Sequence, residues 1–209
     1  MPTAKSKVKS IYGVHPGVAM VRKWIDEMPE KTGKSLDHWI KLIKKEGPPT
    51  NRERREWLKQ EQGLGTNSAS WLADRAEGKN SEDSDPDEYL RAAEKYVEKM
   101  FAGPKASLRP TYDRLLKLGL SLGRDVKACP CQTIVPFYRK HVFAQIKPST
   151  RTRIDLGFAL GDLKGGGRLI DTGGFAKKDR ITHRIAIASA ADIDDEVKRW
   201  LKAAYERDA

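Results

Sequence analysis

In residues 16–77 the apolar positions recur every three or four residues, which is the spacing of amphipathic α-helices. Helix starts are marked by Ser35 and by Thr50 with Glu53 three residues later, a pattern typical of N-caps. Four helices are expected, beginning after Pro16, at Ser35, near Asn51, and at Thr66 or Asn67. The pattern therefore predicts a small all-α domain over residues 16–77.

The last two of these helices are joined by a short turn that contains Gly63 and Gly65, so their outline is that of a helix-turn-helix. Reading bases needs Arg, Lys, Asn or Gln side chains on the second helix of such a pair. That helix exposes mainly small and acidic residues, namely Ser68, Ser70, Asp74, Arg75 and Glu77. The strongest basic cluster lies on the preceding helix, at Arg52, Arg54, Arg55 and Lys59. We therefore expect a helical packing or partner-docking domain rather than a sequence-specific DNA reader.

Two segments without regular spacing flank this domain. Residues 1–15 carry lysines and no apolar periodicity, so we expect a flexible basic tail. Residues 78–86 are polar and acidic, which is typical of a linker between domains. A second domain then extends over residues 87–209 and opens with two predicted helices. The first of them is capped by Asp85, and the second begins near Ser107.

Alternation of apolar and polar residues then replaces the helical spacing and predicts strands with one apolar face at residues 141–147, 153–160 and 183–189. Weaker strand candidates are residues 125–129, 133–138 and 168–170. The closing segment, residues 191–206, has the pattern of an amphipathic helix. The predicted fold class is α+β: the helical domain, then two helices, a mostly antiparallel sheet of about five strands, and a terminal helix across one sheet face.

The other face of this sheet is expected to be more polar. The alternation places small residues there, together with Phe143, Gln145, Arg153, Asp155 and Arg184. Either the two preceding helices cover this face, or a ligand binds against it. In the second case the candidate pocket residues are Tyr138, His141, Arg153, Asp155 and His183, beside Arg184.

Two glycine-rich loops border the sheet, at residues 161–168 and 172–180. Glycine exposes backbone N–H groups, and nearby cations add charge, so either loop is a candidate phosphate site. The candidate anion-binding residues are Lys164, Arg168, Lys177, Lys178, Arg180 and Arg184. Neither loop has a nucleotide-binding fingerprint, and the alternative is that the glycines serve only as turns between strands.

The distribution of charge favours an anionic partner. The 209 residues have a formal net charge of +11, and residues 101–190 carry 17 Lys and Arg against 6 Asp and Glu. Such a field attracts polyanions and phosphorylated ligands, although an ordinary mixed surface would have similar totals. No apolar run approaches the ~18 residues of a membrane span, and the N-terminus lacks the apolar stretch of a secretory signal. We therefore expect a cytoplasmic protein that does not bind membranes.

Motifs for catalysis, metals or cofactors are weak. Cys129 and Cys131 stand one residue apart, too close for an easy disulfide and without the CxxC spacing. With His141 and His183 they would make four zinc ligands only if the fold brought them together, and structural thiols are the simpler interpretation. No catalytic Ser, His and Asp arrangement stands out. We expect no cofactor and no metal, and the sequence does not indicate an oligomeric state.

Several phrases of the sequence resemble two bacterial domains of unknown function. The first domain contains HPGVAMVRKWI, KTGKSLDHWIKLIKKEGP and WLKQEQGLGTNSASWLADRA, and the second contains CPCQTIVPFYRKHVFAQIKPSTRTRIDLGFAL, RLIDTGGFAKKDRITHRI and DIDDEVKRWLKAAY. The two occur fused in uncharacterised proteins of this length, so the resemblance implies the same division into two domains. Domains similar to the second are also appended to nuclease-like domains, which favours nucleic acid as the partner but implies no active site.

These observations favour a non-enzymatic protein whose second domain binds an anionic partner through its Gly/Lys/Arg loops. Nucleic acid is the leading candidate for that partner, followed by a phosphorylated ligand. Two alternatives stay open: a small-molecule binding protein or enzyme that uses the polar sheet face, and a docking module that works through the N-terminal helices.

Overall fold

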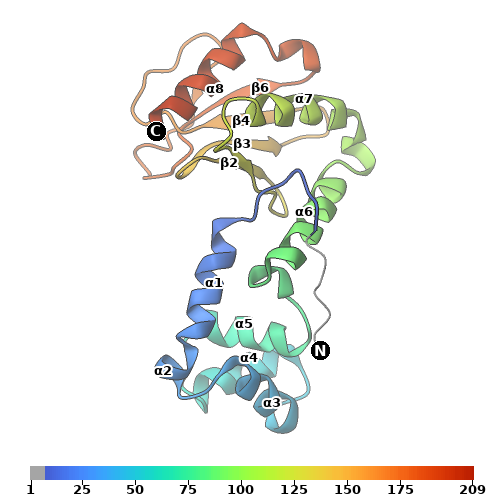
Figure 1. Ribbon diagram of the computed structural model, residues 1–209, viewed down its shortest axis with the longest axis vertical. Coiled ribbons are helices and arrows are strands. Elements are labelled where there is room, and N and C mark those ends of the chain that lie inside the picture. Colours follow the sequence, from blue (N-terminus) through green and yellow to red (C-terminus); the bar gives the residue numbers. More distant parts are fainter. Residues whose placement is uncertain (1–7) are drawn as a thin grey trace. The chain divides into compact units, whose positions relative to one another are not determined.

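A computed structural model describes residues 8–209 (Figure 1). The described chain forms two compact units, one of them His15–Tyr89, here called the helical unit. The other is Leu90–Ala209 together with residues 8–14, here called the sheet unit. An all-α N-terminal part and an antiparallel sheet with a terminal helix make the protein α+β, as the sequence predicts. Within residues 8–209, no helix has the length and apolar character needed to cross a membrane.

The helical unit is built from short amphipathic helices. They are α1 (Pro16–Asp26), α2 (Met28–Thr32), α3 (Leu36–Glu46), α4 (Asn51–Gln60) and α5 (Thr66–Ala76), followed by the 3-10 turn η1 (Ser81–Asp83). Ser35 caps α3, and Thr50 with Glu53 forms the predicted capping box of α4. The first predicted helix is divided at Glu27, because Pro29 has no N–H with which to continue the hydrogen bonds of α1. The predicted cap of α5 is wrong, since Gly65 occupies that position without a side-chain hydrogen bond.

Polar contacts between α4 and α5 neutralise part of the basic cluster on α4. Arg55 Nη2 lies 2.9 Å from Asp74 Oδ1, and Arg54 Nη1 lies 3.5 Å from Glu77 Oε1. The two acids that would repel phosphates from α5 thus also engage two of the four cations on α4. This pairing lowers the positive charge that the helical unit presents to a nucleic acid.

The helix α6 (Pro86–Met100), capped by Asp85, leads into the sheet unit. The elements that follow are η2 (Gly103–Leu108), α7 (Arg109–Leu120), β1 (Lys127–Ala128), β2 (Val135–Tyr138), β3 (Val142–Pro148), β4 (Ile154–Phe158), β5 (Ile170–Asp171), β6 (His183–Ile187), η3 (Ala190–Asp192) and α8 (Asp195–Arg207). The strands form one antiparallel sheet in the order β1-β2-β3-β4-β6-β5. All three strong strand predictions correspond to strands of this sheet, and the weaker ones at 125–129 and 133–138 contain β1 and β2. The weak prediction at 168–170 shares only Ile170 with β5.

Both α7 and α8 lie on the same face of the sheet (Figure 1). A Cβ on Gly119 of α7 would stand 2.4 Å from the ring of Phe137 in β2. On the α8 side, the ring of Tyr205 lies 5.7 Å from that of Phe143 in β3. The alternative in which the two preceding helices cover the second face of the sheet is therefore wrong for α7. The strands offer one strongly apolar face, and both helices bury their own apolar side against it.

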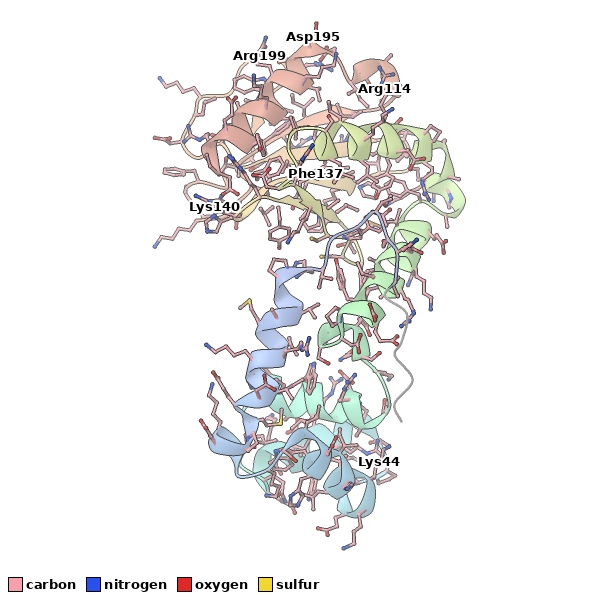
Figure 2. The ribbon with its side chains drawn as sticks, viewed as in Figure 1. Lys44, Arg114, Phe137, Lys140, Asp195 and Arg199 are labelled. Carbon is pink, nitrogen blue, oxygen red and sulfur yellow. The ribbon has the colours of Figure 1, made fainter. Side chains whose placement is uncertain are left out.

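Phe143 reaches this core face through a β-bulge. The register shifts so that Phe137 pairs with Ala144 while Tyr138 pairs with Val142, which leaves Phe143 as the extra residue. The Phe143 ring is fully buried and its centroid lies 6.1 Å from that of Phe137, a residue labelled in Figure 2. The prediction that Phe143 shares a face with Gln145 is wrong, because strict alternation holds only in a regular ladder.

We expect Gly119→Ala to destabilise the sheet unit by about 1–2 kcal/mol. The added methyl group overlaps the buried Phe137 ring, and the better helix propensity of alanine offsets only part of that cost. Gly166→Ala is the matched control, since a Cβ at that position meets nothing within 4 Å. Native-state hydrogen exchange of the β2 and β3 amides measures the difference. Equal protection in the two variants would contradict the packing of α7 on β2.

The predicted basic tail is described only in part, because residues 1–7 lie outside the described residues. Residues 8–14 differ from a flexible tail. The backbone N–H of Gly13 donates to the carbonyl of Ala128 at 2.9 Å, and the hydroxyl groups of Tyr12 and Tyr112 are 3.0 Å apart. Tyr12 is buried by these contacts, so this stretch runs along the edge strand β1 as part of the sheet unit.

Candidate functional site

The sheet face opposite α7 and α8 carries a compact ion cluster. Asp155 in β4 contacts two arginines, since Arg153 Nε and Arg184 Nη1 each lie 3.0 Å from its Oδ1. In the strand register Asp155 stands opposite Lys147 of β3. Three cations thus share this face with one carboxylate whose oxygens are already engaged. The cluster keeps an excess of positive charge, and Asp155 is poorly placed to accept a proton from a substrate.

The remaining pocket candidates do not join this cluster. His141 lies just before β3, and its Nδ1 is 3.0 Å from Asp208 Oδ1 beyond the end of α8. His183 pairs with Phe158 and is fully buried on the core face. Burial and the neighbouring Cys129 and Cys131 raise the pKa of Tyr138 to about 12. Among the five candidate pocket residues, Arg153 and Asp155 contact each other on this face.

The ring of His183 is held by hydrogen bonds that leave neither nitrogen for chemistry. The carbonyl of Leu163 can only accept, so Nε2 donates to it at 2.7 Å. The hydroxyl of Thr182 accepts from the backbone N–H of Leu160 at 3.2 Å and also hydrogen-bonds to Nδ1 at 2.8 Å. His183 thus anchors the loop after β4 to β6.

Cys129 and Cys131 are free thiols, the first buried and the second half-buried. Burial raises the pKa of Cys129 to about 12 and also raises the pKa of Cys131, so both thiols stay protonated near neutral pH. Cys129 Sγ donates to the carbonyl of Val14 at 3.7 Å. Nowhere in residues 8–209 do three His, Cys, Asp or Glu side chains gather as metal ligands.

Arg168, an anion-binding candidate, is engaged in a clamp at the start of α8. Its Nη2 lies 2.5 Å from Asp194 Oδ1 and its Nε lies 3.0 Å from Glu196 Oε2. The pKa of Asp194 is lowered mainly by a hydrogen bond from the backbone N–H of Val197. The pKa of Glu196 is lowered mainly by its hydrogen bond with Arg168. Arg168 therefore fastens its loop to α8 and offers little charge to a ligand.

Arg180 is also paired, but it remains accessible. Its Nη2 lies 2.5 Å from Asp208 Oδ1, and its Nε donates to the carbonyl of Val142 at 2.9 Å. The carboxyl side chain of Asp208 is 3% exposed, whereas the side chain of Arg180 is 52% exposed. The contact fixes where the guanidinium group stands and leaves half of its surface open.

A hollow of about 680 Å³ lies between the loop of residues 172–180 and the end of α8. We call it the Phe175 hollow, and its charged lining consists of Lys178, Asp179, Arg180 and Arg207. Phe175 belongs to the lining and is 58% exposed. Lys178 and Arg180 are among the anion-binding residues predicted from the sequence, whereas Phe175 and Arg207 are not. Phe175 is a large apolar residue, which in a sequence looks like a core residue. Arg207 lies on α8, and only the folded chain brings it to the same hollow as the loop.

The geometry of this loop is fixed by its own hydrogen bonds. The backbone N–H and the hydroxyl of Thr172 both donate to the carbonyl of Thr182, at 3.0 and 2.8 Å, and so close the loop at its base. A Cβ on Gly174 would stand 2.6 Å from the carbonyl oxygen of Ile181, which explains glycine there. Lys164, Lys177 and Lys178 are exposed, and they have no ion pair within the part of the chain that the structure describes.

Comparisons with known proteins bear on both units. Residues 21–78 match the family described as Domain of unknown function (DUF4287), and residues 97–208 match the one described as Domain of unknown function (DUF5655). No curated protein and no solved structure matches the chain significantly. The second match spans more than half of the sequence and includes the whole sheet, α8 and the Phe175 hollow. The chain therefore belongs to the family described as Domain of unknown function (DUF5655) and joins it to an N-terminal stretch similar to DUF4287.

Proposed function

We propose that the sheet unit binds single-stranded nucleic acid at the Phe175 hollow. The observation that carries this proposal is an aromatic ring, 58% exposed, in a hollow lined by three cations and one acid. Proteins hold single strands by stacking bases on aromatic rings while nearby cations contact the phosphates. The Phe175 hollow offers both groups on one surface.

The backbone of the loop supports this proposal. Lys178 has a φ of 60°, a left-handed conformation that costs a non-glycine residue about 1 kcal/mol or more. Glycine or asparagine would suit this turn better, so the lysine side chain occupies the position at a cost in stability. Its neighbour Lys177 is exposed as well, and the two side chains add charge beside the ring.

Reversing these two charges is expected to weaken nucleic-acid binding strongly. The variant Lys177→Glu/Lys178→Glu should bind a labelled single-stranded oligonucleotide about tenfold or more weakly, because two phosphate contacts become repulsive. Phe175→Ala should lose about 1–3 kcal/mol of binding free energy through the missing stack. Fluorescence anisotropy over a series of salt concentrations measures both, with DNA and RNA strands compared.

The matched control is Arg114→Glu/Lys117→Glu, which makes the same change of charge on the exposed side of α7 (Figure 2). It should bind like the wild type apart from a small effect of net charge. The proposal would be contradicted if the wild type bound no oligonucleotide at low salt, or if the two double variants lost the same amount of affinity.

A further inference from the structure

A second hollow in the sheet unit is lined by four cations, and none of its lining residues is acidic. The cations are Lys99, Lys105, Lys147 and Arg151, and hydroxyl groups of Thr133 and Ser149 join them. The hollow measures about 570 Å³, which lies in the range of small-molecule sites. We call it the four-cation hollow.

The cations come from three stretches that the fold brings together: the end of α6, the turn η2, and the end of β3 with the turn after it. The Lys105 side chain is held in place before any ligand binds, because its Nζ donates to the carbonyl of Pro148 at 2.6 Å. Lys147 faces Asp155 across the strands, but Arg153 and Arg184 already hold that carboxylate. The positive charge of the hollow therefore lacks a counter-ion within the described chain.

We propose that the four-cation hollow binds the oligophosphate group of a small polyphosphorylated ligand. Four cations around one concavity suit a ligand with several negative charges close together, and the hydroxyl of Thr133 supplies a further donor to phosphate oxygens. The lining contains no aromatic ring, so bases would find no surface on which to stack. This site is independent of the Phe175 hollow, and its ligand is small rather than a polymer.

Calorimetric titration of the whole chain with inorganic tripolyphosphate tests the inference. The wild type should bind, and Lys147→Glu/Arg151→Glu should bind roughly a hundredfold more weakly, because two charge-assisted contacts are lost. The neutral variant Lys147→Gln/Arg151→Gln should show an intermediate loss. Both positions are exposed, so circular dichroism and thermal unfolding should match the wild type.

The variant Lys177→Glu/Lys178→Glu serves as the control and should keep its affinity for tripolyphosphate. Oligonucleotide binding should show the opposite order: it should be lost in Lys177→Glu/Lys178→Glu and retained in Lys147→Glu/Arg151→Glu. No binding of tripolyphosphate by the wild type, or undiminished binding by Lys147→Glu/Arg151→Glu, would overturn the inference. It would equally be overturned if the Lys147→Glu/Arg151→Glu change abolished oligonucleotide binding alone, since the hollow would then be part of a nucleic-acid surface.

Discussion

Replacing Phe143 by alanine is expected to lower the unfolding free energy of the sheet unit by about 3–5 kcal/mol. The ring is fully buried between Phe137 and Tyr205, with centroid distances of 6.1 and 5.7 Å. Alanine would leave a cavity at the junction of β2, β3 and α8, where the helix and the bulged strand limit collapse. A regular strand would instead point this ring to the opposite face, and the substitution would then cost little.

Phe175→Ala is the matched control, because it removes the same ring from a site where 58% of the residue is exposed. It should change stability by less than about 1 kcal/mol. Native-state hydrogen exchange of the β3 and β4 amides separates the two variants without requiring that both units unfold together. A similar small effect for both variants would show that the bulge does not direct Phe143 into the core.

Replacing Asp208 by alanine is expected to cost the sheet unit about 3 kcal/mol. The carboxylate accepts from the backbone N–H groups of Lys140 and His141, at 3.0 and 2.7 Å, and it also contacts the His141 ring and Arg180. Alanine would leave these donors without an acceptor at a nearly inaccessible position. Asp179→Ala, on the exposed loop, is the control and should stay within about 0.5 kcal/mol of the wild type.

The stabilisation by Asp208 should depend on pH. Burial alone would raise the pKa of Asp208, but the His141 backbone and ring together with Arg180 outweigh burial and lower it. A lowered folded-state pKa means that the contribution is present above the unfolded-state pKa of an aspartate and is lost as the pH falls through the folded-state value. Unfolding curves of the wild type and Asp208→Asn should therefore converge in acid. A difference that is constant from neutral to acidic pH would contradict the assigned contacts.

The helix ends were predictable where the signal is local. Ser35, Thr50 and Glu53 contact backbone groups only three residues away, so the sequence spacing contains the whole interaction. The division at Glu27 was missed because the apolar spacing continues across Pro29, although the hydrogen-bond ladder does not. The outward position predicted for Phe143 failed for a related reason, since a bulge changes the face of a residue without changing the alternation of the sequence.

The candidate site was predictable as a set of loops but not as a set of available charges. Lys177 and Lys178 are exposed on their loop, where the glycines and lysines of the sequence indicated them. Arg168 and Arg180 look alike in sequence, yet Asp194 and Glu196 engage the first and Asp208 engages the second. Each of these partners lies 26 to 28 residues further along the chain.

The sequence by itself determined the α+β class, the helical N-terminal part, the positions of most strands and the glycine-rich basic loops. These features arise from interactions within a few residues, and spacing and composition express them directly. Only the tertiary structure decided that α7 and α8 share one sheet face, that Phe143 is core, and that Phe175, Lys178 and Arg207 line one hollow. It also gathered Lys99, Lys105, Lys147 and Arg151 around one hollow. Such contacts join segments far apart in the chain, and their free energy depends on how whole faces pack, which no local pattern records.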